Sequence, residues 1–342
     1  MLGDRAHVRL HRAGLAVALV AGYVASVLLS IFVSRTGGAA ASLWTATGFL
    51  AGAFVLLPRP WRIGVAASCV FAQGAIALIA GDGPVQATLY PLVNLLEAAL
   101  AGWLAIRFCG VRARRLSLRE LALLPIAAIT PAVAIAAGLG ALINLALRGE
   151  PLLDGWLGWA IQGGLGMLIV MPAVLLASRV GQYREFDRSG PETAAILAGM
   201  GAVVAAVFLQ NDLPLQFAIF PALTLIAVRL GPPGAAAACL LTAMIALPLS
   251  VLVEGPAALS HGLDGVGRVR LTELIVVAAL VSTLVTAVAV GDQARLRQLM
   301  LGRDRAARAA RLRARRAEAA ARGQGSAQSE AVSPGERVAS VA

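Results

Sequence analysis

The stretch WLGWAIQGGLGMLIVMPAVLLAS, residues 156–178, contains no charged side chain. A helix needs about 20 mainly apolar residues to cross the hydrocarbon core of a bilayer, and this stretch meets that length. Nine other apolar blocks of similar length occur along the 342-residue chain. With 59% hydrophobic and 14% charged residues, the chain has too little polar surface to cover a soluble fold. The sequence therefore predicts an all-α fold, a polytopic transmembrane helix bundle.

The distribution of arginine sets the expected topology of about ten spanning helices. We place these helices at residues 13–33, 39–57, 62–80, 87–108, 120–146, 156–178, 192–209, 213–230, 233–253 and 270–290. With the N-terminus in the cytoplasm, 25 of the 29 basic residues lie inside, and the four outside are Arg35, Arg148, Arg268 and Arg270. Omitting one helix would invert every later loop, so the positive-inside rule favours an even number of helices with both termini cytoplasmic.

The chain divides into three expected parts. Residues 1–12 form a short cytoplasmic N-terminus, residues 13–290 form the membrane domain, and residues 291–342 form an Arg-rich cytoplasmic tail. The first apolar run is longer than the core of a cleaved signal peptide, so we expect it to remain as the first spanning helix. In the tail, residues 293–321 predict a helix, and the Gly-, Ser-, Gln- and Pro-containing remainder predicts disorder.

Composition argues against metal, nucleic-acid and catalytic sites. Cys69, Cys109 and Cys239 lie far apart and the three histidines lie outside the apolar blocks, so no metal or cofactor is expected. The net charge of +11 would favour a nucleic-acid partner in a soluble protein, but the tail from Gly291 onward holds 11 Arg and 5 acidic residues, a net of +6. We therefore expect no nucleic-acid partner. No nucleophile, base and orienting residue occur at a suitable spacing, so an enzyme is not expected.

Glu97 is the acidic residue near the centre of a predicted spanning helix, and Asn94 shares its helical face. A carboxyl group inside the membrane is a candidate functional group. No basic residue lies at a similar depth, so we expect Glu97 to be protonated or hydrogen-bonded. The polar side chains available as its partners are Asn94, Thr45, Thr47, Gln73 and Gln162. A structural hydrogen bond between helices is the alternative role for Glu97.

Two more segments bring polar and small residues into the bundle from its outer side. The second predicted helix begins with Trp44 and Thr47, and the sixth begins with Trp159, Gln162 and Gly166. Together with the carboxyl and amide groups of the fourth helix, these residues form the candidate site for a ligand or signal. Tryptophan at this depth also anchors helices at the interface, and glycine also permits close packing, so each segment has a structural alternative.

Four short motifs carry a resemblance to a known family. They are Leu43-Trp44 with Gly48, Arg59-Pro60-Trp61 with Gly64, Asn94-Leu95-Leu96-Glu97-Ala98, and Trp159 with Gly166-Met167-Leu168-Ile169-Val170-Met171-Pro172. In order and separation these motifs resemble the first class of MASE domains, the membrane-associated sensor domains of bacteria. The resemblance is specific over residues 43–172 and rests mainly on hydropathy over residues 192–290.

The chain departs from the family pattern at two places. The family often has prolines where this chain has Thr45 and Ala46, and an acidic residue where this chain has Gly163. If that acidic residue helps to bind the signal in the family, ligand recognition is altered or lost in this chain.

The resemblance implies a sensory module of the bacterial plasma (inner) membrane, usually joined to a cytoplasmic histidine kinase or diguanylate cyclase. After residue 290 the sequence contains no Gly-Gly-Asp-Glu-Phe segment, no phosphoacceptor histidine and no nucleotide-binding glycine box. We therefore expect a stand-alone sensor or sensor-like subunit with a separate signalling partner. A small-molecule or ion transporter and a non-catalytic membrane assembly factor are the alternatives. A homodimer is compatible with each, and the nature of the signal stays open.

The tail concentrates arginine directly after the last predicted spanning helix. Seven arginines lie within a short span in which Asp304 is the single acidic residue. They are Arg303, Arg305, Arg308, Arg311, Arg313, Arg315 and Arg316. We expect these side chains to contact anionic lipid head groups, since a basic residue near an anionic surface contributes about 1 kcal/mol. A plain topology anchor and a helix that docks a protein partner are the alternatives.

Overall fold

The computed structural model describes residues 2–37, 44–111, 116–210, 213, 215–252 and 265–332. Every regular element within these ranges is helical. The elements are α1 (Leu2–Gly37), α2 (Ala46–Leu56), α3 (Arg59–Ile79), α4 (Pro84–Arg107), α5 (Leu118–Leu123), η1 (Leu124–Ile129), α6 (Thr130–Arg148), α7 (Leu152–Ala177), η2 (Val180–Gln182), η3 (Arg184–Phe186), α8 (Gly190–Leu209), η4 (Leu215–Ala218), α9 (Ile219–Leu252) and α10 (Gly265–Val332). The chain forms two compact units, Met1–Gly291 and Asp292–Ala342, and each is described by itself.

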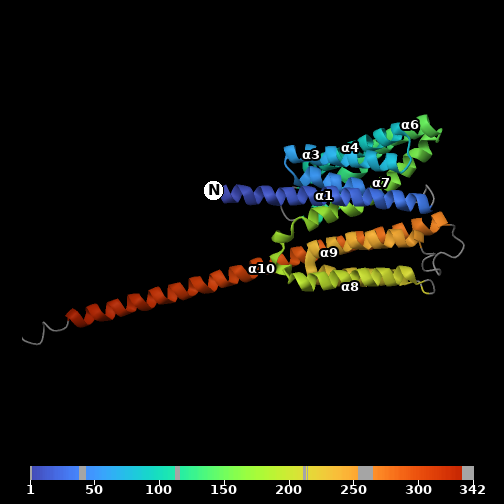
Figure 1. Cartoon of the computed structure of the whole chain (residues 1–342). Coiled ribbons are helices and arrows are strands. Elements are labelled where there is room, and N and C mark those ends of the chain that lie inside the picture. Colours follow the sequence, from blue (N-terminus) through green and yellow to red (C-terminus); the bar gives the residue numbers. More distant parts are fainter. Residues whose placement is uncertain are drawn as a thin grey trace, which may run out of the picture. The chain divides into compact units, whose positions relative to one another are not determined.

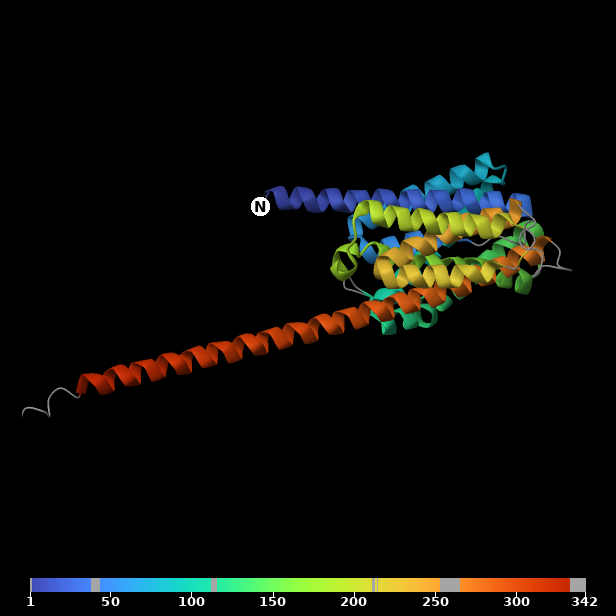
Figure 2. The same cartoon turned by 90° about the horizontal axis from the view of Figure 1, so that it is seen from below.

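The first unit is a membrane helix bundle, as the sequence predicts. Figure 1 and Figure 2 both show its helices running side by side. Within the residues that the structure describes, eight helices are long and apolar enough to cross a membrane, and Ala46–Leu56 is a shorter apolar helix. Large apolar side chains face outward, with Ile79 87% and Phe71 79% exposed, which is the pattern of a lipid-facing surface. The all-α, multi-pass fold is thus confirmed, whereas the number of ten spans and the side of each terminus stay predictions.

Three of the ten predicted helices account for the difference in number, because one is short and two are joined. Of the helix predicted at 39–57, the structure shows α2 from Ala46 to Leu56, and Leu43 of the family motif lies outside the described residues. The helices predicted at 213–230 and 233–253 are joined in α9, but Gly231 inside it is not helical, with φ 64° and ψ −166°. A positive φ is adopted readily only by glycine, and Pro232 and Pro233 follow it. The predicted break between these two helices therefore falls at a real change in the backbone.

The helix predicted at 120–146 has three parts in the structure. Ser117 and Glu120 form a capping box that starts α5, because each side chain binds the backbone N–H group of the other residue. The π-helix η1 follows and contains Pro125, and α6 then begins next to Pro131. Proline lacks a backbone N–H donor and clashes with the preceding turn, which explains a wider turn at this point. A hydropathy pattern shows the span but not this local change.

Helix α7 lies at the centre of the first unit and contacts α2, α6 and α9. The glycines of α2 let α7 approach closely. A Cβ atom at Gly48 would lie 2.6 Å from Val170 Cβ, and one at Gly52 would lie 2.6 Å from Val174 Cγ1. Glycines four residues apart are a frequent device for packing membrane helices backbone to backbone. The seam between α2 and α7 therefore consists of Val170 and Val174 of α7 packed directly on the glycine face of α2.

The second unit holds the continuation of α10, which ends at Val332. The helix predicted at 293–321 is thus present, and it extends into the remainder for which we expected disorder. The seven arginines from Arg303 to Arg316 are all exposed. Residues 333–342 lie outside the described residues.

Candidate functional site

Glu97 is completely buried, with 0% of its surface exposed, and lies on α4 within the candidate span Pro84–Arg107. Its Oε2 atom accepts a hydrogen bond of 3.3 Å from Nε1 of Trp159 on α7. Its Oε1 atom has no hydrogen-bond partner among the described residues. Groups of three or more His, Cys, Asp or Glu that could hold a metal ion do not occur in the part of the chain that the structure describes. The carboxyl group of Glu97 is half-satisfied, since Oε2 accepts a hydrogen bond and Oε1 accepts none.

Gly163 lies directly against the carboxyl group of Glu97. A Cβ atom at Gly163 would be 3.0 Å from Oε1 and 3.5 Å from Oε2 of Glu97. Trp159, Gly163 and Gly166 are spaced by four and three residues, so they share one face of α7. The position at which the family often has an acidic residue is thus in contact with the buried carboxyl, and the glycine leaves Oε1 without the partner that such a residue could supply.

The segment that precedes α2 is attached to the same face of α7. The backbone N–H of Trp44 donates to the carbonyl oxygen of Gln162 over 3.2 Å. A Cβ atom at Gly166 would lie only 2.0 Å from the carbonyl oxygen of Trp44, so any side chain there would collide with backbone. Of the predicted site residues, Gln162 contributes its main chain here. Its side chain lines another groove, of about 560 Å³, together with Val133 of α6 and Leu168 of α7.

Three buried polar atoms of this region have no hydrogen-bond partner among the described residues: Glu97 Oε1, Thr47 Oγ1 and Trp44 Nε1. The Thr47 side chain is close enough to the Glu97 carboxyl to act on it as a hydrogen-bonding group, although the contact does not meet the strict geometry of a hydrogen bond. Leaving a buried polar atom unpaired costs about 1–3 kcal/mol. Such atoms are few in native proteins, and a group of them calls for water or a ligand as the missing partner.

Asn94 lies beside this site but bonds elsewhere. Its Nδ2 donates to Oε1 of Gln73 over 3.2 Å, and the hydroxyl of Tyr23 on α1 donates to the same oxygen. All three side chains are buried. The structure gives Glu97 the indole of Trp159 as a hydrogen-bond partner, which the sequence did not suggest, and of the five candidates expected from sequence Thr47 also interacts with the carboxyl.

Sequence reasoning missed a second polar chain that reaches Trp159. The ring of Tyr90 meets Trp159 edge to face, with centroids 5.4 Å apart. The Tyr90 hydroxyl donates to Asn144 Oδ1, and Asn144 Nδ2 donates to Glu150 Oε2 over 2.7 Å. Tyr90 precedes Glu97 by seven residues and therefore lies on the same face of α4, a signal that the sequence did contain.

Arg179, which the predicted topology places in a cytoplasmic loop, is buried in the structure. It follows α7 directly and is only 3% exposed. Burial lowers the pKa of its guanidinium, and the nearby Tyr183 and Glu120 act in the opposite direction. This arginine is thus part of the packed end of the bundle and not a freely solvated loop residue.

A family model called MASE1 matches residues 13–293. The chain belongs to the MASE1 family. MASE1 domains are membrane sensory domains, so the chain is a multi-pass membrane sensory domain, and its family is not a catalytic one. The match covers the residues of the four motifs and extends to the helices for which hydropathy alone carried the resemblance. Neither a curated protein nor a solved structure matches the chain.

Proposed function

We propose that this MASE1 protein binds its signal at the half-satisfied carboxyl of Glu97 and conveys the signal to a cytoplasmic signalling protein. The observation that supports this site is the set of three buried polar atoms without partners, on Glu97, Thr47 and Trp44. A ligand with a hydrogen-bond donor for Oε1 and an acceptor for the indole would satisfy groups that the chain itself leaves unpaired. The free-energy cost of leaving these groups unpaired would then favour the bound state.

The surrounding packing offers a way for occupancy to change the bundle. Gly166 and the carbonyl of Trp44 are in backbone contact, and Gly48 continues the same seam. A ligand beside Trp44 and Thr47 would have to widen or tighten this seam between α2 and α7. Since a ligand shifts an equilibrium only by its differential affinity, signalling requires two packings of this seam.

The route to the cytoplasm runs through the helices that contact α7. Helix α9 packs against α7, and Cys239 of α9 lies against the Leu280 carbonyl of α10. Helix α10 then continues to Val332.

We propose a histidine kinase or a diguanylate cyclase as the class of partner, and the bacterial inner membrane as the location. Reporter fusions near Glu150 and at the C-terminus test the sidedness, with an external signal near Glu150 and a cytoplasmic one at the C-terminus expected.

A chimera tests the site without knowledge of the ligand. A diguanylate cyclase catalytic domain is joined after Gly291, where the first unit ends, and cyclic di-GMP is measured in cells. Coupling between two sites is commonly worth about 5- to 150-fold, so Glu97→Gln is expected to change the output about fivefold or more at equal abundance. Asp154→Asn, which alters an exposed acid in the first turn of α7, the helix that carries the Trp159 partner of Glu97, is the control. Equal output from Glu97→Gln and the wild type would leave Glu97 a structural role only.

A further inference from the structure

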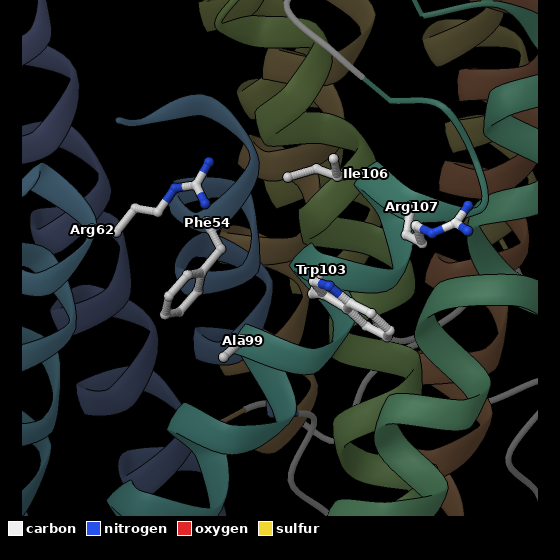
Figure 3. A pocket seen from close by; sticks show the side chains of 6 residues that line it. All are labelled: Phe54, Arg62, Ala99, Trp103, Ile106 and Arg107. Atoms are coloured by element: carbon white, nitrogen blue, oxygen red, sulfur yellow. The ribbon is translucent and has the colours of Figure 1, made fainter. Parts of the chain in front are cut away.

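A groove of about 510 Å³ opens where α2 ends, α3 begins and α4 ends. Phe54, Arg62, Ala99, Trp103, Ile106 and Arg107 line it. Figure 3 shows Arg62 and Phe54 on one side of the groove, and Trp103 and Arg107 on the other. The groove therefore combines two guanidinium groups with two aromatic rings at one end of the bundle.

Local packing explains why the groove exists. Helix α2 stops at Leu56, and the extended Pro58 turns the chain into α3. Above the turn, α2 approaches α4 closely because a Cβ atom at Gly102 would lie 2.6 Å from Phe54 Cβ. Ala99 and Trp103 are four residues apart on one face of α4, and the small side chain of Ala99 leaves space beside the indole.

The two guanidinium groups are held in place yet carry uncompensated charge. Nε of Arg62 donates to the carbonyl oxygen of Leu57 over 2.6 Å, which fixes the side chain at the end of α2. The guanidinium of Arg107 lies over the Phe108 ring, 5.3 Å from its centroid. Within the described part of the chain, the ion pairs involve Arg35 and Arg229, and neither groove arginine takes part in one. The groove is thus flanked by two guanidinium groups that form no ion pair within the described residues.

The apolar part of the groove comes from the candidate span Pro84–Arg107 and from the shorter apolar helix Ala46–Leu56, which carries Phe54. Trp103 lies inside the candidate span Pro84–Arg107 and is 57% exposed, so its indole faces the bilayer. Arg62 and Arg107 lie near the ends of the spans Arg59–Ile79 and Pro84–Arg107. Positive charge at the span ends and aromatic surface within the span match the polarity of a phospholipid, which has its anionic group at the interface and its acyl chains below.

We propose that this groove binds one anionic phospholipid, with its head group at Arg62 and Arg107 and an acyl chain against Phe54 and Trp103. A soluble anion would use the guanidinium groups but would not cover the exposed apolar surface of Trp103. The site is separate from Glu97 and does not depend on the proposed signal site. It also differs from the arginine tail, because it lies entirely within Met1–Gly291.

Quenching of Trp103 fluorescence tests the proposal on the full-length protein in nanodiscs. Phosphatidylglycerol and phosphatidylcholine with brominated acyl chains are the quenchers, and the difference between wild type and Trp103→Phe isolates the signal of this indole. Phosphatidylglycerol should quench Trp103 at a lower mole fraction than phosphatidylcholine. Each of Arg62→Gln and Arg107→Gln should raise the phosphatidylglycerol fraction needed for half-maximal quenching about fivefold, the factor that corresponds to about 1 kcal/mol per basic residue.

Arg59→Gln is the matched control, since Arg59 is an exposed residue at the start of the same α3 and does not line the groove. Its effect should be small, and an effect equal to that of Arg62→Gln would overturn the proposal in favour of general surface charge. Equal quenching by both lipids in the wild type would also overturn it. Displacement of the lipid by glycerol phosphate in the buffer would show a site for a soluble anion instead. Arg62→Lys and Arg107→Lys keep the charge and should bind if a Gln variant fails to fold.

Discussion

Glu97 and the arginine tail place charged or polar side chains in opposite environments, one buried and one exposed. Glu97 is fully buried, with one carboxyl oxygen unpaired, whereas the arginines from Arg303 to Arg316 are exposed in the second unit. Burial makes each hydrogen bond at Glu97 count toward stability and binding, because the alternative is an unsatisfied group. Exposure makes the tail arginines insensitive to packing and sensitive to salt and to the charge of a nearby surface. The comparison shows that the role of a polar residue depends more on whether it is buried or exposed than on its residue type.

The largest effect is expected from the tail. A peptide of residues 293–321 should gain helicity and bind with anionic vesicles, because seven arginines at about 1 kcal/mol each sum to several kcal/mol before screening. Raising the salt concentration should release it, as circular dichroism and co-sedimentation with vesicles would show. Neutral vesicles are the control. Equal binding to neutral and anionic vesicles would remove charge as the cause and favour a protein partner.

The next effect concerns the seam beside the buried site. Gly166→Val should destabilise the bundle by about 3 kcal/mol, since its side chain would collide with the carbonyl of Trp44, which packed backbone cannot easily avoid. Unfolding in mixed micelles followed by circular dichroism measures this change. Gly158→Val on the same α7 is the control, because a Cβ atom there meets nothing within 4 Å. Similar losses for both variants would mean that helix propensity, and not the close approach, determines the effect.

A smaller loss is expected when the buried carboxyl is removed. Glu97→Ala should cost about 1–3 kcal/mol because it leaves the indole N–H of Trp159 without its acceptor, whereas Glu97→Gln keeps an acceptor and should cost less. The same unfolding measurement compares the two variants. If Glu97→Ala unfolds at the wild-type denaturant concentration, the carboxyl and the indole do not form a bond that matters to stability.

The smallest effect is expected at the partly exposed polar chain. Asn144→Ala removes the link between Tyr90 and Glu150 and should cost about 1 kcal/mol, the usual net value of a hydrogen bond open to water. Thr88→Val, which deletes an exposed local bond to Pro84, should change stability by less than about 0.5 kcal/mol. A loss at Asn144 as large as that at Glu97 would contradict the proposed difference between buried and exposed groups.

Much of the fold could be predicted from the pattern of apolar residues. The blocks at 62–80, 156–178 and 192–209 agree with α3, α7 and α8 to within a few residues, because lipid requires long, internally bonded helices whatever their neighbours. The break at Gly231 was also visible in the sequence, through the glycine and the two prolines that follow. The π-helix at Pro125 was not, since it depends on how one turn accommodates a proline.

The residues of the candidate site could be proposed from the sequence, but the hydrogen bonds between them could not. Trp44, Trp159 and Gly166 drew attention through their residue types and the MASE1 motifs, and the structure brings all three to one face of α7. The bond from Trp159 to Glu97 could not be foreseen, since helical periodicity specifies which face a residue occupies but not which neighbouring helix meets that face. Gln162 illustrates the same limit, because its carbonyl accepts a hydrogen bond from Trp44 whereas the residue also lines a different groove.

The sequence by itself determined that this protein lies in a membrane, that it is helical and which family it belongs to. These properties follow from composition, periodicity and short motifs along one chain. The tertiary structure alone decided that Glu97 lies against Gly163, that Trp44 lies against Gly166, and that Arg62 and Arg107 flank one groove. These contacts join residues far apart in the chain, and they depend on interhelical distances of a few ångströms. Such distances result from all the packed side chains together, and no local pattern encodes them.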